Sequence, residues 1–297
     1  MPSERVPRWV FNHLKDNIRK RELIAGGFEE RKGGGFRPDA TAWAIFALSA
    51  AGTNNDFLEL SRHRLASQQS ADGRIGISPN HPEAFWPTSL AVLAWQGSTT
   101  SQEAHDRAIH FLMTTSGTHS KRQPHSAVTD NTDLIGWSWD AKTYSWVEPT
   151  ALALIALRKA GHGNHSRVAE GIELLLDRQL PDGGWNYGNK TVYGRELHPM
   201  PGPTGLALQA LEGRVMKDQV KKSIKYLKTQ VCQLHTPLTL SWSLLGLAAW
   251  AESPASSEKF VSECLERQSF GGEYDTSNSS LLLSALLSTN GLLHGKG

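Results

Sequence analysis

A single glutamate stands at the start of an apolar, helix-like segment, where its chemistry depends on what surrounds it. The segment begins Trp146-Val147-Glu148-Pro149-Thr150 and continues with only alanine, leucine and isoleucine over residues 151–157. An acid beside an apolar cavity keeps its proton to higher pH, because burial disfavours the charged form, and it can then protonate a substrate. The same glutamate could instead only favour the positive end of its helix dipole and touch no substrate. Glu148 is therefore the first candidate for a catalytic acid, with Asp140 and Asp275 as candidate helpers.

Aromatic residues gather near the starts of the apolar segments. An aromatic face attracts a carbocation, and it also makes a good wall for a flat or polyisoprenoid ligand. Large rings also fill the space between helices, and we expect this of many of them. The candidate ligand-binding residues are Asp39, Trp43, Trp86, Trp137, Trp139, Trp146, Tyr187, His198, Trp242 and Tyr274.

Metal-ligating residues are scattered along the chain. Asp39, His198 and His235 could converge on one site, but lone histidines at such spacings are more typical of surface or capping positions. Cys232 and Cys264 stand alone in helix-like segments, without a Cys-x-x-Cys pair. We therefore expect no metal and no cofactor, and the two free thiols favour a reducing, cytoplasmic compartment.

The segments that must position these residues are repeated along the chain. Proline often opens them, because its φ is preset for a helix and the N–H that it lacks would have been unpaired there. The residues that follow are apolar on every side, which predicts inner helices surrounded by neighbours. The anchors recur at intervals of 35 to 62 residues, near the period of paired-helix repeats. They are Thr41, Thr88, Thr150, Thr204, Thr239 and Ser279.

Amphipathic segments and short turns lie between these anchors. Residues 168–176 and 220–231 have apolar side chains three and four apart, which predicts outer helices. Glycine-rich turns at 68–76, 178–188 and 267–275 join outer to inner helices, with 33–39 as a degenerate first copy. Six alternations predict an all-α (α/α)6 toroid of six outer/inner helix pairs, as a single domain over residues 1–297, with the first four anchor threonines at one end.

Composition excludes several classes of partner. The 297 residues carry 31 Lys and Arg against 29 Asp and Glu, without a long basic run among aromatics, so we expect no nucleic acid. The longest apolar stretch, 238–250, is interrupted by threonine and serine and is shorter than the roughly 20 residues that span a bilayer. A surface patch could still make a peripheral membrane contact or bind a protein partner.

The glycine-rich turns resemble those of a known family. RQLPDGGWNYG, at 178–188, is similar to the Gln-x-x-x-Gly-x-Trp repeats of the prenyltransferase and squalene-hopene cyclase superfamily. RQSFGGEYD and QQSADGRIG match more weakly, and the resemblance extends from about residue 33 to residue 291. It implies that Gln179, Gly184 and Trp185 belong to the scaffold. It also implies a terpenoid cyclase-like toroid whose central cavity takes an apolar or isoprenoid small molecule at the N-terminal ends of the inner helices.

The catalytic motifs of that family are missing. The Asp-x-Asp-Asp motif of class II terpene cyclases would fall on residues 146–151, where Glu148 takes the place of the proton-donating Asp and Pro149 that of its neighbour. The Asp-x-Cys of the zinc-dependent branch would fall on Asp39 or Asp275, and neither has the thiol. The Asp-rich magnesium motif of class I terpene synthases and the thioester motif of complement-like toroids are missing too.

Three functions stay open from the sequence. The first is an isoprenoid cyclase that uses Glu148 as its acid. The second is a catalytically inactive toroid that serves as a binding scaffold for a lipid, a peptide or a protein. The third is a polysaccharide lyase or hydrolase, which would need Glu148 paired with Asp140 or His198.

Overall fold

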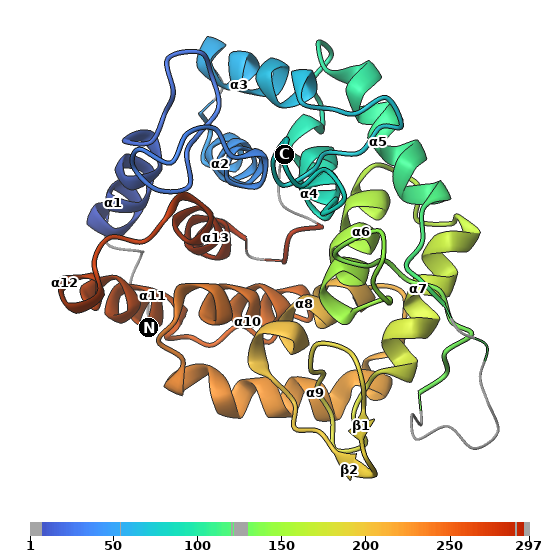
Figure 1. Ribbon diagram of the computed structural model, residues 1–297. Coiled ribbons are helices and arrows are strands. Elements are labelled where there is room, and N and C mark those ends of the chain that lie inside the picture. The colour runs from blue at the N-terminus through green and yellow to red at the C-terminus, as the bar shows by residue number, and fades with distance from the viewer. Residues whose placement is uncertain (1–7, 54, 120, 122–129, 289, 294–297) are drawn as a thin grey trace.

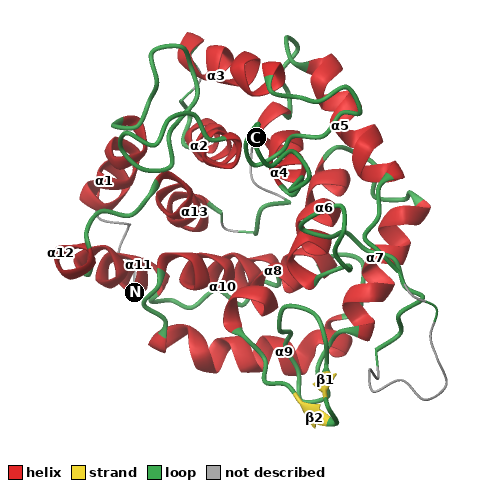
Figure 2. Cartoon of the chain, in the orientation of Figure 1, coloured by secondary structure: helices red, strands yellow, loops and turns green. Residues whose placement is uncertain are grey.

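The protein is almost entirely helical. The computed structural model describes residues 8–53, 55–119, 121, 130–288 and 290–293. The strands within that part of the chain, β1 (Thr191–Val192) and β2 (Arg195–Glu196), form a short antiparallel hairpin at the edge of the molecule (Figure 2). The all-α prediction is confirmed. The ends of the predicted domain, residues 1–7 and 294–297, lie outside the described residues.

Outer and inner helices alternate in chain order around a closed ring (Figure 1). The inner helices are α2 (Pro38–Ala50), α4 (Pro87–Trp95), α6 (Val147–Lys159), α8 (Pro201–Leu211), α10 (Pro237–Ala249) and α13 (Thr276–Leu287). The outer helices are α1 (Arg8–Arg19), α3 (Asp56–Ser67), α5 (Gln102–Thr114), α7 (Ser166–Asp177), α9 (Lys217–Gln230) and α11 (Ser257–Glu266). The short helices η1 (Val231–Gln233) and α12 (Gln268–Gly271) lie in connections. Each inner helix contacts the next and α13 contacts α2, which confirms the (α/α)6 toroid.

Burial follows the apolar pattern of each class of helix. In α6 the whole run from Pro149 to Leu157 is buried, because neighbours surround the helix on every side. In α9 only one face is buried, by Val220, Ile224 and Leu227, while lysines cover the face toward water. No helix among the described residues is long and apolar enough to cross a bilayer.

A buried threonine near the start of four inner helices holds the loop that precedes its helix. The threonines are Thr41, Thr88, Thr150 and Thr204. The loop residues that they hold are, in the same order, Phe28, Ile75, Trp137 and Trp185. Each Oγ1 accepts the backbone N–H of its loop residue at 2.9 to 3.0 Å. It also donates to the carbonyl of the same residue at 3.2 to 3.3 Å. We call this pair of bonds a threonine clamp.

Two of the predicted anchors differ from these four. The Ser279 hydroxyl accepts a hydrogen bond from Asn17 Nδ2 at 2.9 Å, so its partner comes from helix α1. Thr239 is partly exposed and makes no threonine clamp among the described residues. The first clamped residue is Phe28, 13 residues before Thr41, so the first copy of the repeat lies upstream of the predicted turn at 33–39.

The loops before the inner helices meet at one end of the ring, which we call the mouth. Val147 at the start of α6 donates its N–H to the Tyr187 carbonyl before α8, at 2.9 Å. Thr276 at the start of α13 donates to the Glu30 carbonyl before α2, at 3.0 Å. The four clamping threonines therefore lie together at the mouth, and the C-terminal ends of the inner helices form the opposite end, which we call the base.

The ring is joined between its first and last segments by side chains of α1 and of the loop after it. Asn17 Nδ2 and Arg21 Nη2 both donate to the Tyr274 carbonyl, at 3.1 and 2.8 Å. Thr276 Oγ1 donates to the Glu29 carbonyl at 2.6 Å. Helix α1 is thus the outer helix that packs against α13.

Replacing Thr150 by valine should destabilise the protein by about 1–3 kcal/mol, because the buried N–H of Trp137 then loses its partner. Urea unfolding measures this change. The matched control is Thr229→Val on the exposed face of α9, which should change the free energy of unfolding by less than about 0.5 kcal/mol. Equal effects of the two substitutions would show that the threonine clamps do not hold the loops.

Candidate functional site

Glu148 is the second residue of α6 and lies at the mouth. The helix begins there because Trp146 has an extended backbone and Pro149 fits the first turn. The side chain is partly buried, and no hydrogen bond or ion pair reaches its carboxylate within the described part of the chain. Burial alone raises the pKa of Glu148 to about 7. A large fraction of the molecules therefore carry the proton near neutral pH, as a general acid requires.

A second group of carboxyls lies at the mouth on the side of α2 and α13. Burial, followed by the charges of Asp275 and Asp39, raises the pKa of Glu30 to about 7. Ser277 donates to the Glu30 carboxylate through its N–H at 3.2 Å and through its hydroxyl at 2.8 Å. Glu30 was not among the sequence candidates. It lies two residues after the clamped Phe28, as Trp139 and Tyr187 lie two residues after their own clamped residues.

Asp39 and Asp275 already have partners. Both oxygens of the Asp39 carboxylate accept from Arg37, at 2.9 and 2.8 Å. Asp275 caps α13 by accepting the Asn278 N–H at 2.9 Å. Their charges act on Glu30, whereas burial alone acts on Glu148. Asp39 and Glu148 both lie two residues before a clamping threonine, so they hold equivalent positions in the repeat. Arg37 pairs with Asp39, whereas Glu148 has no such partner among the described residues.

The other polar candidates lie in turns or at the surface. Asp140 accepts the Lys142 N–H at 2.9 Å within its own turn. His198 and His235 are exposed. Among the described residues no hydrogen bond pairs Glu148 with Asp140 or His198.

The aromatic candidates divide between the mouth, the ring interior and the scaffold. Trp86 and Trp139 meet edge to face at the mouth, with centroids 5.6 Å apart. The ring of Trp146 packs against Gly188, and Tyr187 is about half exposed. These four side chains reach water or the surface of the mouth.

Deeper side chains fill the interior. Trp43 on α2 and Trp242 on α10 meet edge to face with centroids 5.6 Å apart, although α13 separates their helices in the ring. Trp137 is fully buried and donates from Nε1 to the Leu112 carbonyl at 2.8 Å. The Tyr274 hydroxyl donates to the Cys264 carbonyl at 2.6 Å, which ties the loop before α13 to α11. Trp137 and Tyr274 thus hold the scaffold together.

The glycine-rich turn that carries the family resemblance ties α7 to α9. Gln179 Nε2 donates to Ser223 Oγ at 2.8 Å and to the Gln219 carbonyl at 3.1 Å. Trp185 is buried and donates from Nε1 to the Leu175 carbonyl at 2.7 Å. Gly184 has a φ of +84°, and a Cβ there would lie 2.5 Å from Pro199. These contacts are structural.

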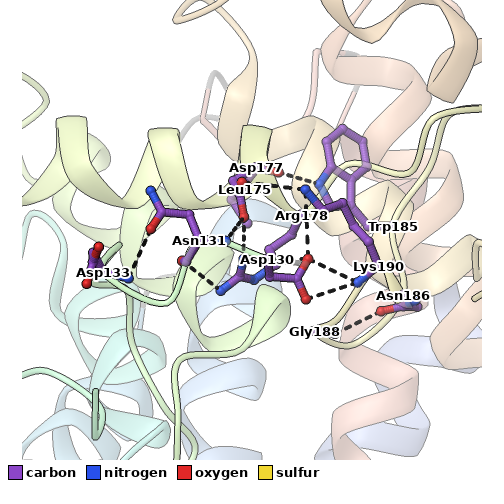
Figure 3. A network of polar contacts seen from close by, with 10 residues as sticks. All are labelled: Asp130, Asn131, Asp133, Leu175, Asp177, Arg178, Trp185, Asn186, Gly188 and Lys190. Atoms are coloured by element: carbon purple, nitrogen blue, oxygen red, sulfur yellow. Dashed lines mark hydrogen bonds and ion pairs between the residues drawn. The ribbon is translucent and has the colours of Figure 1, made fainter. Parts of the chain in front are cut away.

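A buried ionic network joins Asp130, the end of α7 and Lys190 (Figure 3). The fully buried Asp130 lies 3.7 Å from Arg178 and 3.8 Å from the Lys190 ammonium, and it also accepts the Lys190 N–H. Asp177 pairs with the same two cations. The network fixes residues 186–190, which contact Val147 and Trp146 at the start of α6. Nothing in the spacing of these residues marked them in the sequence.

The described residues contain no group of three His, Cys, Asp or Glu side chains that could hold a metal ion. Cys232 is exposed on η1. Cys264 is buried on α11, where its Sγ contacts the His235 carbonyl and the Tyr274 hydroxyl.

Solved structures share this architecture. No protein-family model matches the chain, and no curated protein matches its sequence. A crystal structure of a protein from Actinoplanes is 13% identical with a TM-score of 0.61, and the match covers 95% of this chain and 99% of that one. A variant of type II terpene cyclase MstE from Scytonema, in complex with its substrate geranylgeranyl dihydroxybenzoate, is 12% identical with a TM-score of 0.61 and a coverage of 96% and 99%. At these identities the likeness shows a terpenoid cyclase-like fold.

Glu148→Gln should reduce the dependence of stability on pH. The pKa is about 7 in the folded protein and 4.5 in the unfolded chain, so the proton stabilises the folded state fully below pH 4.5, and this contribution is lost as the pH rises to about 7. The raised pKa of Glu30 also makes the folded state less stable as the pH rises. Part of the dependence of stability on pH should therefore remain in Glu148→Gln. Urea midpoints at about pH 5 and about pH 8 measure the difference.

Glu252→Gln is the control, because Lys217 and Lys228 lower the pKa of Glu252 to about 2. The stability that the Glu252 carboxylate contributes is lost only as the pH falls below 4.5. Between about pH 5 and about pH 8 the stability of Glu252→Gln should therefore change with pH as much as that of the unmodified protein. An unchanged slope in Glu148→Gln would mean that water solvates the Glu148 carboxyl in the folded protein.

Proposed function

We propose that the mouth of the ring binds the hydrocarbon chain of an isoprenoid and that Glu148 starts its cyclisation by protonating an alkene. The observation that carries the proposal is a carboxyl without a partner among the described residues, whose pKa burial raises to about 7. Carboxyls whose pKa burial raises in this way cluster at functional sites, where a proton is given or taken near neutral pH.

The proposed reaction is a proton transfer followed by ring closure. The Glu148 carboxyl gives its proton to one carbon of a C=C bond, a C–H bond forms, and the other carbon becomes a tertiary cation. A second alkene of the same chain attacks this cation and closes a ring. Loss of a proton to Glu148 or to water ends the reaction. The indole faces of Trp86, Trp139 and Trp146 would attract the cation.

The comparison with MstE supports an isoprenoid as the ligand class. That protein shares the fold along nearly its whole length and binds a geranylgeranyl substrate. The mouth of this chain adds several tryptophans and Glu148, whose pKa burial raises to about 7, and these groups together would suit a chain of alkenes.

A second candidate is a binding scaffold without catalysis. The edge-to-face contact of Trp43 with Trp242 favours it, because two large rings occupy the interior below the mouth. A scaffold of this kind would bind an apolar ligand at the mouth and release it unchanged.

A product assay separates the two functions. If the protein is a cyclase, Glu148→Gln should lower turnover of prenyl diphosphates or squalene by about 10²- to 10⁴-fold, the usual contribution of a general acid. Ligand binding and fold should persist in the variant. The control is Glu252→Gln, on the surface beside Lys217 and Lys228, which should retain full turnover. Absence of cyclised product from the unmodified protein on every such substrate would establish the scaffold.

A further inference from the structure

A groove of about 580 Å³ lies between α9 and the turn that follows α10. Figure 1 shows α9 on the outside of the ring, beside α10. None of the aromatic or acidic residues of the mouth lines this groove. The lysines that line it all come from α9 and are Lys217, Lys221, Lys225 and Lys228. They outnumber the acidic residues of the lining, Asp218 and Glu252, so the groove is positively charged.

Two of these lysines already hold a carboxylate of the same chain. Lys217 Nζ donates to Oε1 of Glu252 and Lys228 Nζ donates to Oε2, each at 2.6 Å. These hydrogen bonds lower the pKa of Glu252 to about 2. Ammonium groups of the groove can therefore hold a carboxylate between them.

The other two lysines have no carboxylate of their own. Lys221 and Lys225 are exposed, and no hydrogen bond or ion pair reaches them within the part of the chain that the structure describes. They are four residues apart, so they lie on the same face of α9, about 6 Å apart along its axis. Like charges at this spacing repel each other, and a bound anion would relieve that repulsion.

The groove also has an apolar floor and an extension. Ile224 lines the groove between the two free lysines and is only 4% exposed. A second hollow, of about 350 Å³, shares Lys228 and Glu252 with the groove and continues to Phe260 on α11. The two hollows form one trough, and a flat surface would meet the lysines without reaching this floor.

The spacing of the free lysines fits an extended peptide. Alternate side chains of an extended chain point to the same side and lie about 6.6 Å apart. This distance is close to the axial separation of about 6 Å between Lys221 and Lys225. Two acidic side chains at alternate positions can therefore pair with both lysines at once.

We propose that this trough docks an extended, acidic segment of a partner protein, with carboxylates at alternate positions on Lys221 and Lys225. The docked segment runs along α9 above Ile224. The proposal does not depend on the proposed function, because no residue of the trough belongs to the mouth.

Two peptides of equal composition test the docking. The first has twelve residues of alternating glutamate and serine. The second repeats Glu-Glu-Ser-Ser three times, so that no two of its glutamates are two positions apart. Each carries an N-terminal fluorescein, and fluorescence anisotropy measures its binding to the full chain at about 50 mM salt. The alternating peptide should bind about three-fold more tightly, the contribution of one further exposed ion pair.

Substitution of the two free lysines locates the bound peptide. Lys221→Gln combined with Lys225→Gln should weaken binding of the alternating peptide at least about five-fold, because two ion pairs are lost. The preference for that peptide should disappear with them. The matched control combines Lys32→Gln with Lys142→Gln, which removes the same charge from exposed lysines outside the trough. It should change the affinity by less than about two-fold, since salt screens distant charges.

Glu252→Gln tests the trough from the opposite direction. Without its carboxylate, Lys217 and Lys228 become available to further glutamates of the alternating peptide. The affinity should therefore rise about three-fold or more. An affinity that Glu252→Gln leaves unchanged would place the peptide elsewhere on the surface and overturn the proposal.

Two further results would overturn the docking of a peptide. Equal affinities of the two peptides, or an equal loss of affinity in the trough variant and the control, would mean that net charge alone attracts them. Vesicles of phosphatidylserine and phosphatidylcholine test a membrane as the alternative occupant. If the unmodified protein binds these vesicles through Lys221 and Lys225 and does not prefer the alternating peptide, the lysines serve a membrane instead.

Discussion

The structure depends on the threonine clamp, in which one buried hydroxyl satisfies both polar groups of a buried loop residue. A loop over the end of a ring of helices would otherwise bury its N–H and C=O groups without partners. The same two hydrogen bonds satisfy these groups at four threonines, Thr41, Thr88, Thr150 and Thr204. The loops can therefore pack tightly over the starts of the four inner helices that carry a clamp.

The mouth that results contains two equivalent positions with different electrostatics. Asp39 and Glu148 lie at the same place relative to their clamps, but Arg37 neutralises Asp39 through two hydrogen bonds. Glu148 has no such partner among the described residues, and burial raises its pKa to about 7. A repeat fold can thus keep one copy of a position as structure and leave another copy free for chemistry.

Much of the fold could be predicted from the sequence, because the inner helices are apolar on every side and their threonines recur. The first copy of the repeat was predicted at the turn 33–39, whereas the loop residue that Thr41 holds is Phe28, 13 residues before it. Glu30 was missed with it. The contact of Trp43 with Trp242 and the network around Asp130 depend on which helices face one another, and local patterns do not encode this.

The central claim is that the ring holds an acid in its neutral form at the mouth. Carbon-13 NMR of side-chain carboxyls, with Glu148 assigned by comparison with Glu148→Gln, measures its pKa directly. The structure predicts a titration near 7. A titration near the ordinary value of 4.5 would contradict the account, because Glu148 would then be an ordinary helix-terminal carboxylate.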